Sequence, residues 1–171
     1  DKMNKYAGNS ITLAFVIGMV IMIVAHFLSR PLLKAIDTPD DIIDMSAQYI
    51  DVLYYAVPIQ MSLNNFNALS RAVGDSKRPL YFLIVSVIVN LLLDILFVGA
   101  FKWGVIGAAW ATAISELVAA VLSAISVLKY TEEYNIDKTA LKIDGKVSWA
   151  QIKIGIPISL QFSITSIGSM V

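Results

Sequence analysis

Four long apolar stretches constrain the fold of this chain more than any other feature of its sequence. They cover residues 11–33, 49–69, 79–101 and 105–128, and a fifth apolar stretch begins near Ile152. A helix needs about 20 apolar residues to cross the hydrocarbon core of a bilayer, and an isolated strand cannot satisfy its backbone hydrogen bonds there. The sequence therefore predicts an all-α integral membrane protein, a polytopic bundle of four full transmembrane helices and the start of a fifth.

The composition agrees with this fold class and argues against several others. Hydrophobic residues make up 57% of the chain and charged residues 15%, whereas a soluble domain carries about 25% charged residues. The formal net charge of zero says nothing about nucleic-acid or acidic partners, and we expect no nucleic-acid partner for a membrane bundle. The chain has no cysteine and one histidine, which excludes thiolate chemistry and multi-histidine metal sites. The chain also lacks an HExxH motif, so its one candidate catalytic group is a carboxylate pair of Asp94 and Glu116. Such a pair alone is too unspecific to predict an enzyme.

Basic residues indicate the orientation of the spans. Ten of the 13 Lys and Arg residues lie before the first span, between the second and third, or between the fourth and fifth. The loop after the first span instead carries the acidic cluster of residues 37–44. Because basic loops remain cytoplasmic, we expect a multi-pass protein of the cell (plasma) membrane with its N-terminus in the cytoplasm.

One face of the third apolar stretch is polar. Ser86, Asn90 and Asp94 are spaced i, i+4 and i+8, so they share one side of a helix. A charged Asp near the centre of a membrane helix costs about 2.5–3.5 kcal/mol on insertion scales, which a partner, a cavity, a cation or a proton must offset. The stripe is therefore predicted to face the interior of the bundle.

Two other stretches carry matching polar residues. Gln60, Asn64 and Asn67 share a face of the second, and Thr112 and Glu116 are an i, i+4 pair in the fourth. Carboxylate, amide and hydroxyl oxygens can bind a hard cation such as Na⁺, and a carboxyl group in a site of low dielectric constant can exchange a proton. The alternative is that these groups only hold helices together by hydrogen bonds. For Asp94 the functional interpretation is preferred.

Backbone features also mark the second and fourth stretches. Pro58 removes a backbone hydrogen bond and is a predicted hinge. Gly107, Ala111 and Ser115 follow the spacing of small residues that lets membrane helices approach closely. The polar segment 131–147 is the longest stretch outside the apolar ones, and it is the predicted boundary between two bundles.

Three motifs in order resemble the multidrug and toxic compound extrusion (MATE) family. They are "SRAVGDSKRP", "VNLLLDILFV" with its N-x-x-x-D spacing, and "KWGVIGAAWATAISE". The resemblance extends from about Ile11 to the end of the chain. It implies a transporter of twelve helices in two lobes, a monomer that exports cationic and other amphipathic small molecules by antiport with Na⁺ or H⁺ through alternating access. Membrane lipid and the remaining helices of the same polypeptide would then be its other partners.

The resemblance also assigns regions and residues. It implies that residues 1–130 are helices three to six of the N-terminal lobe, residues 131–147 a cytoplasmic interlobe loop, and residues 148–171 the start of helix seven. The family's site for the coupling ion maps onto four positions, with no cofactor beyond Na⁺ or H⁺ and no metal beyond a possible Na⁺ at Asp94. They are Asn64, Asn90, Asp94 and Thr112. A second tier consists of Glu116, Gln60 and Ser86, which the polar helix faces indicate but the family's site does not include.

One position departs from the family pattern. Some members carry a Glu eight residues after the proline of the seventh helix, where this chain has Thr165 after Pro157. We therefore do not expect a carboxylate site in the second lobe. A lipid-linked oligosaccharide flippase of the same superfamily is one alternative, although the span interiors lack the cationic residues such flippases use. A non-transporting membrane scaffold is the other.

Overall fold

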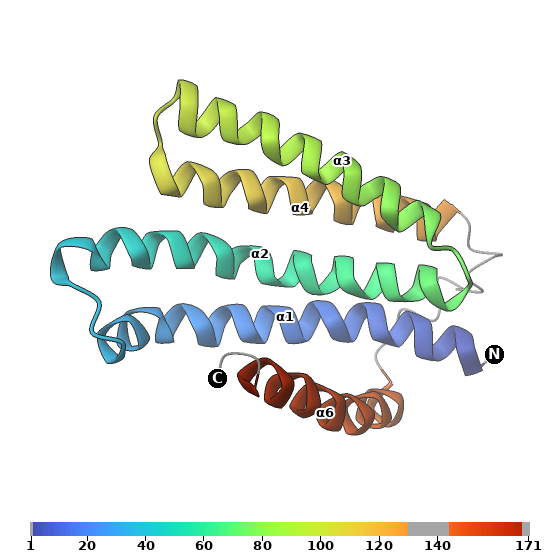
Figure 1. The fold of residues 1–171 in the computed structure, drawn as a ribbon. Coiled ribbons are helices and arrows are strands. Elements are labelled where there is room, and N and C mark those ends of the chain that lie inside the picture. The colour runs from blue at the N-terminus through green and yellow to red at the C-terminus, as the bar shows by residue number, and fades with distance from the viewer. Residues whose placement is uncertain (1, 130–143, 169–171) are drawn as a thin grey trace.

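The computed structural model describes residues 2–129 and 144–168, and all of its regular structure in those ranges is helical. The predicted all-α polytopic membrane bundle is confirmed. Figure 1 shows the helices and their order along the chain. Their bounds are α1 Lys2–Ala35, α2 Asp40–Ala72, α3 Lys77–Asp94, the π-helical turn η1 Ile95–Ala100, α4 Gly104–Lys129 and α6 Gly145–Gly168.

Three helices in the described ranges are long and apolar enough to cross a bilayer. Their spans are Lys5–Ala35, Lys77–Ala100 and Gly104–Val127. α2 does not meet this criterion, although it runs alongside α1 and has 33 residues. The predicted span 49–69 lies within α2, and its Gln and Asn residues lower the mean hydropathy. Helix length and packing, rather than composition alone, therefore place α2 in the bundle.

The first four long helices pack in the spatial order α1, α2, α4, α3. α1 packs against α2, α2 against α4, and α4 against α3 (Figure 1). Val52 and Ala56 of α2 and Ala109 and Ala113 of α4 form a buried apolar cluster. Alanines are common at this contact because small side chains let two membrane helices approach closely. α2 and α4 are therefore the centre of the described bundle, and α1 and α3 flank them.

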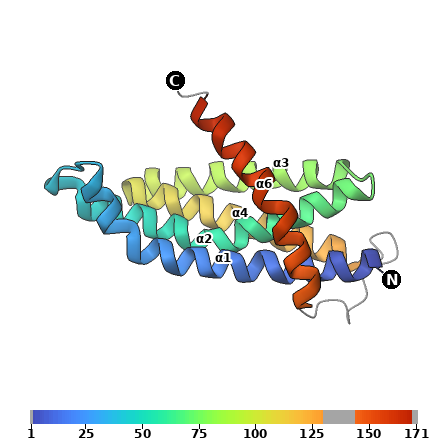
Figure 2. The ribbon, with the colours of Figure 1, turned by 90° about the horizontal axis from the view of Figure 1, so that it is seen from below.

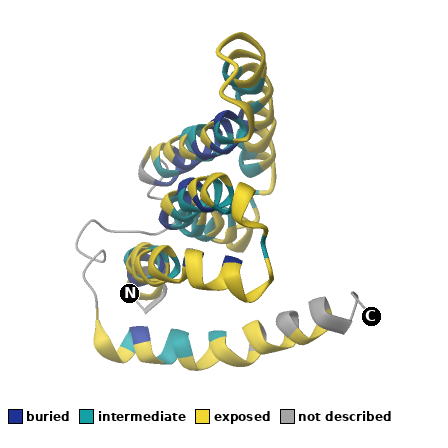
Figure 3. Cartoon of the chain, turned by 90° about the vertical axis from the view of Figure 1, so that its left-hand side faces the viewer, coloured by how far each residue is buried: buried dark blue, intermediate teal, exposed yellow. Residues whose placement is uncertain are grey.

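α6 crosses α1 near the N-terminal end of α1 and then diverges from the other helices (Figure 2). Figure 3 shows that its surface is mostly exposed, whereas buried residues gather where α1, α2 and α4 face one another. Large apolar side chains are exposed along α1 and α3; Val20 and Leu91 are examples. Lipid can cover such faces in a membrane protein.

The turn between α2 and α3 explains part of the "GDSKRP" motif. Gly74 has a φ of 83°, a left-handed conformation that glycine adopts without strain. Asp75 follows, and its carboxylate accepts hydrogen bonds from the backbone N–H groups of Lys77 (3.1 Å) and Arg78 (3.2 Å). These N–H groups belong to the first turn of α3 and have no partner within the helix. The glycine thus ends one helix and the aspartate caps the next.

Close backbone contacts occur where the sequence supplies glycine. A Cβ atom on Gly18 of α1 would lie 2.6 Å from Cα of Pro58 in α2. A Cβ on Gly107 would lie 3.1 Å from Cβ of Phe97. Ala111 and Ser115, which share the spacing of Gly107, are buried. The prediction of close packing along this small-residue face is confirmed.

Candidate functional site

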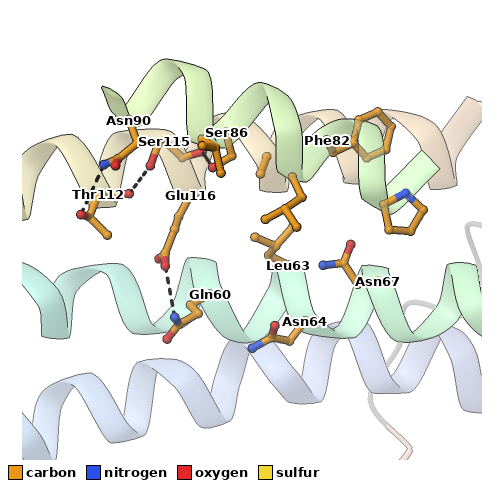
Figure 4. A pocket seen from close by; sticks show the side chains of 14 residues that line it. Gln60, Leu63, Asn64, Asn67, Phe82, Ser86, Asn90, Thr112, Ser115 and Glu116 are labelled. Atoms are coloured by element: carbon orange, nitrogen blue, oxygen red, sulfur yellow. Dashed lines mark hydrogen bonds between the residues drawn. The ribbon is translucent and has the colours of Figure 1, made fainter. Parts of the chain in front are cut away.

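Polar side chains from three helices surround a hollow of about 320 Å³ between α2 and the α3–α4 pair (Figure 4). Most of the residues predicted to form the site line this hollow, with amide, hydroxyl and carboxyl groups on its walls. The polar lining residues are Gln60, Asn64 and Asn67 from α2, Ser86 and Asn90 from α3, and Thr112, Ser115 and Glu116 from α4.

Hydrogen bonds join α3 to α4 along one wall of the hollow. Asn90 Nδ2 donates to Thr112 Oγ1 at 3.5 Å, and Thr112 Oγ1 donates to the carbonyl of Ala108 at 3.1 Å. One turn away, the buried hydroxyl of Ser86 donates to the carbonyl of Ser115 at 2.9 Å. Two residues that the sequence places on different helices, Asn90 and Thr112, are therefore in direct contact.

Asp94 lies one turn beyond Asn90 and does not line the hollow. Its side chain is half-buried, and its Oδ1 atom is buried without a hydrogen-bond partner in the described part of the chain. Buried polar atoms are nearly always paired, so this oxygen needs a partner from outside the described residues. The next residue begins η1, and π-helical turns inside α-helices are frequent at functional sites.

Glu116 and Gln60 connect the two sides of the hollow. Gln60 Nε2 of α2 donates to Glu116 Oε1 of α4 at 3.1 Å (Figure 4). Glu116 is half-buried, and the described lining of the hollow includes no Lys, Arg or His. The carboxyl group therefore has a neutral donor beside it and no cation to balance its charge.

The predicted hinge residue lies at a close approach of α1 and α2, opposite Gly18. Pro58 is buried inside α2, which continues through it, and the hydroxyl of Ser62 donates to the Pro58 carbonyl at 2.8 Å. A Ser side chain bonded to the carbonyl four residues earlier often accompanies a bend. Asn64, one and a half turns beyond Pro58, is exposed to the hollow. Bending at Pro58 stays a prediction.

Sequence reasoning missed a junction between α1 and α6. Asn9 is only 1% exposed, and its Oδ1 accepts a hydrogen bond from the backbone N–H of Asp144 at 2.8 Å. Its Nδ2 donates to Gln151 Oε1 at 2.8 Å and lies 3.1 Å from Ser148 Oγ. Asn9 is separated from these partners by about 140 positions. A single sequence contains no signal for such a pairing, because Asn9 precedes the predicted span and resembles any interfacial polar residue.

A second missed pair lies toward the far end of α1. His26 Nδ1 is 3.1 Å from Asp51 Oδ1 of α2, and the His26 ring is near Tyr55. Arg30 and Asp44 form an ion pair at 3.0 Å further along. These contacts hold the ends of α1 and α2 together, away from the hollow.

A second cavity lies between α1, α2 and α6. Its volume is about 640 Å³, and its lining is mainly apolar, with Ser10, Asn65, Gln151 and Ser159 as polar members. Ser10 Oγ donates to Asn65 Oδ1 at 3.3 Å, so part of this polar surface is already paired. The cavity lies beside the Asn9 junction, since Ser10 and Gln151 line it.

Comparisons with known proteins agree with the fold and identify the family. The probable multidrug resistance proteins YoeA and YpnP of Bacillus subtilis are 29% and 30% identical to this chain over 99% and 84% of its length. The multidrug export protein MepA of Staphylococcus aureus is 24% identical over 84% of the chain. The chain spans only 38%, 32% and 32% of these three relatives, respectively.

A solved structure shares the same arrangement of helices. It is a MOP superfamily transporter from Pyrococcus furiosus, with a TM-score of 0.82 and 23% identity, over 92% of this chain and 35% of that one. At this identity the likeness concerns the fold. The MatE family model matches residues 1–96, more than half of the chain. The chain belongs to the MatE family.

Proposed function

We propose that this chain is part of a secondary active multidrug efflux transporter that exports cationic and amphipathic compounds by antiport with Na⁺ or H⁺. The family and the names of the relatives support efflux. In this proposal residues 1–130 are helices three to six of the N-terminal lobe and residues 148–171 begin the second lobe. Residues 131–147 are the cytoplasmic interlobe loop, of which positions 131–143 lie outside the described residues.

The observation that carries the proposal is the buried Oδ1 atom of Asp94, which has no hydrogen-bond partner among the described residues and lies one turn from the hydrogen-bonded Asn90. Water would solvate this atom in a soluble protein, but a carboxyl group in a membrane helix needs another source of stabilisation. A proton on Asp94, or Na⁺ held by Asp94 with oxygen atoms of Asn90 and Thr112, would supply it. These three residues form the core of the proposed coupling site. Asn64 lies one turn beyond Gln60, on the side away from Asn90 (Figure 4), so its part in this site stays a prediction.

Alternating access follows from the position of this site between helices. An ion at Asp94 favours one arrangement of α3 against α4, and a substrate that favours the other arrangement is bound and released in exchange. Linkage requires that each ligand weakens the other to the same degree. Pro58 of α2, which packs against Gly18 of α1, is the proposed hinge. The full-length protein would act as a monomer in the plasma membrane, with the N-terminus of this chain on the cytoplasmic side.

The flippase alternative is disfavoured by charge. For the Pyrococcus furiosus transporter, a reversed polarity of the binding pocket suggests a different function. In this chain the described lining of the hollow has one carboxyl group and no basic side chain. An anionic lipid-linked sugar would be repelled by such a lining, whereas a cationic compound would be attracted.

The test is substrate export by the full-length protein in drug-sensitive cells and in vesicles with an imposed Na⁺ or H⁺ gradient. Asp94→Asn should abolish gradient-driven export at normal expression, because an amide can neither bind a proton nor balance Na⁺. Asp44→Asn removes a carboxylate from the exposed ion pair with Arg30 and is the matched control. Full export by Asp94→Asn would rule out the coupling role. If cells with the wild-type protein grow normally but export no substrate, the scaffold alternative is favoured.

A further inference from the structure

Glu116 and Asp94 lie at different depths along the α3–α4 pair. α3 and α4 are antiparallel, with Ser86 beside Ser115 and Asn90 beside Thr112. Glu116 follows Ser115, so it lies at the level of Ser86, eight residues before Asp94. Eight residues of helix correspond to about 12 Å. The two carboxyl groups are therefore not one site, and Glu116 needs a role of its own.

The surroundings of Glu116 leave its charge unbalanced. Within the described part of the chain, its one hydrogen bond comes from the neutral amide of Gln60, whereas a carboxylate can accept about four. The described residues that line the hollow offer no basic side chain to pair with it. A charged group inside a membrane bundle is costly and is a functional candidate by default. A cation that enters the hollow could therefore pair with Glu116.

The hollow has the features that bind an organic cation. Its volume of about 320 Å³ is at the lower end for small-molecule sites. Phe82 and Leu83 line one side together with the carboxyl group of Glu116, and the amides of Asn64 and Asn67 line another. An aromatic ring and a carboxylate both attract an ammonium group, and apolar side chains accept its substituents. A bare Na⁺ would gain nothing from the apolar part of this lining.

Building on the proposed transport function, we infer that Glu116 binds the cationic group of the exported compound and that Gln60 occupies this position in its absence. The amide of Gln60 stabilises the carboxylate while the hollow is empty. An incoming ammonium or other organic cation forms a stronger, charge-assisted contact and displaces it. Glu116 thus selects cations as cargo, separately from the coupling ion at Asp94.

The experiment measures saturable binding of ethidium, a permanent organic cation, to the purified full-length protein by fluorescence polarisation. Glu116→Gln should weaken binding by about tenfold or more, since losing one partner of a poorly hydrated charge pair is costly. Glutamine keeps an oxygen that can accept from Gln60, so the contact between α2 and α4 remains. Thermal unfolding of each variant checks this. Unchanged ethidium affinity in Glu116→Gln, or no saturable binding to the wild type, would overturn the inference.

Two further variants separate recognition from structure. Glu116→Asp keeps the charge and should retain more affinity than Glu116→Gln. Gln60→Ala removes the competing amide and should raise ethidium affinity by about threefold, because a neutral hydrogen bond contributes only modest net stability. Equal loss of affinity in Gln60→Ala and Glu116→Gln would overturn the inference, since a purely structural tie between the helices would produce that result.

Failure of the proposed function gives a different pattern. If ethidium binds in a Glu116-dependent manner but its export does not depend on an ion gradient, the coupling proposal fails and this inference stands. If gradient-driven export is intact in Glu116→Gln with unchanged preference for cations, the inference fails and the coupling proposal stands.

Discussion

Asn9 and Gln151 are joined by a hydrogen bond of 2.8 Å between the first helix and the last. The same Asn9 side chain also accepts from the backbone N–H of Asp144, and the Gln151 amide donates to the carbonyl of Tyr6 at 2.8 Å. α6 diverges from the bundle beyond this point (Figure 2). The position of α6 on the other helices therefore depends on a few polar contacts at one end.

Asn9→Leu should weaken this junction. The change leaves the N–H of Asp144 and the side chains of Ser148 and Gln151 without their partner, and each unpaired buried group costs about 1–3 kcal/mol. We expect a lower unfolding temperature of the full-length protein and faster hydrogen exchange at residues 145–152. Asn67→Ala is the control, because Asn67 lines the hollow rather than the junction. Equal exchange in both variants would contradict the role of Asn9.

Gly18→Ala should destabilise the contact between α1 and α2. An added Cβ would meet the Pro58 backbone at 2.6 Å, so one helix must shift, and overpacking of this kind costs about 1–3 kcal/mol. Gly155→Ala is the control, because a Cβ there meets nothing within 4 Å. Thermal unfolding in detergent measures both. We expect a clear loss for Gly18→Ala only, and equal unfolding temperatures would show that the two helices do not approach this closely.

Thr112→Val should weaken ion coupling while preserving the fold. Valine has nearly the same shape but cannot accept from Asn90 or provide an oxygen to an ion. We expect the Na⁺ or H⁺ concentration for half-maximal export to rise by about tenfold, at unchanged expression. Ser123→Ala on the same helix is the control, because Ser123 Oγ is buried and unpaired among the described residues. If Ser123→Ala impaired coupling equally, the effect would not be specific to the proposed site.

Asp75→Ala should destabilise the start of α3. The carboxylate of Asp75 accepts from two backbone N–H groups and lies 3.2 Å from Arg78 Nε. Loss of a helix cap costs about 0.5–2 kcal/mol. We expect a modest fall in unfolding temperature that Asp75→Asn partly restores, since an amide oxygen can still accept. Asp44→Asn at the exposed ion pair should have almost no effect, and a comparable fall there would point to a general charge effect.

The fold could be predicted because apolar length alone requires helices in a membrane. The third stretch, residues 79–101, corresponds closely to Lys77–Ala100, where α3 continues into η1. Helix ends were predicted less well. α1 begins at Lys2 and α2 at Asp40, several residues before the apolar stretches, because a helix can continue into polar surroundings where apolar length no longer marks its end.

The site was only partly predictable for a physical reason. Helical spacing placed Asn90 and Thr112 on interior faces, and the structure brings them into contact. The same spacing put Asp94 on the stripe of Ser86 and Asn90, yet Asp94 lies outside the hollow, next to a π-helical turn that no periodic pattern reveals. The Asn9 junction depends on the position of α6 in the folded molecule, and a single sequence does not reveal that position.

Gly18 lacks a side chain, so the backbone of α1 touches α2 at the very residue where a bend is proposed. A bend at Pro58 would therefore move α1 together with α2. Because Asn9 lies on α1, the same motion would displace the start of α6. One bend in α2 would then change the positions of three helices.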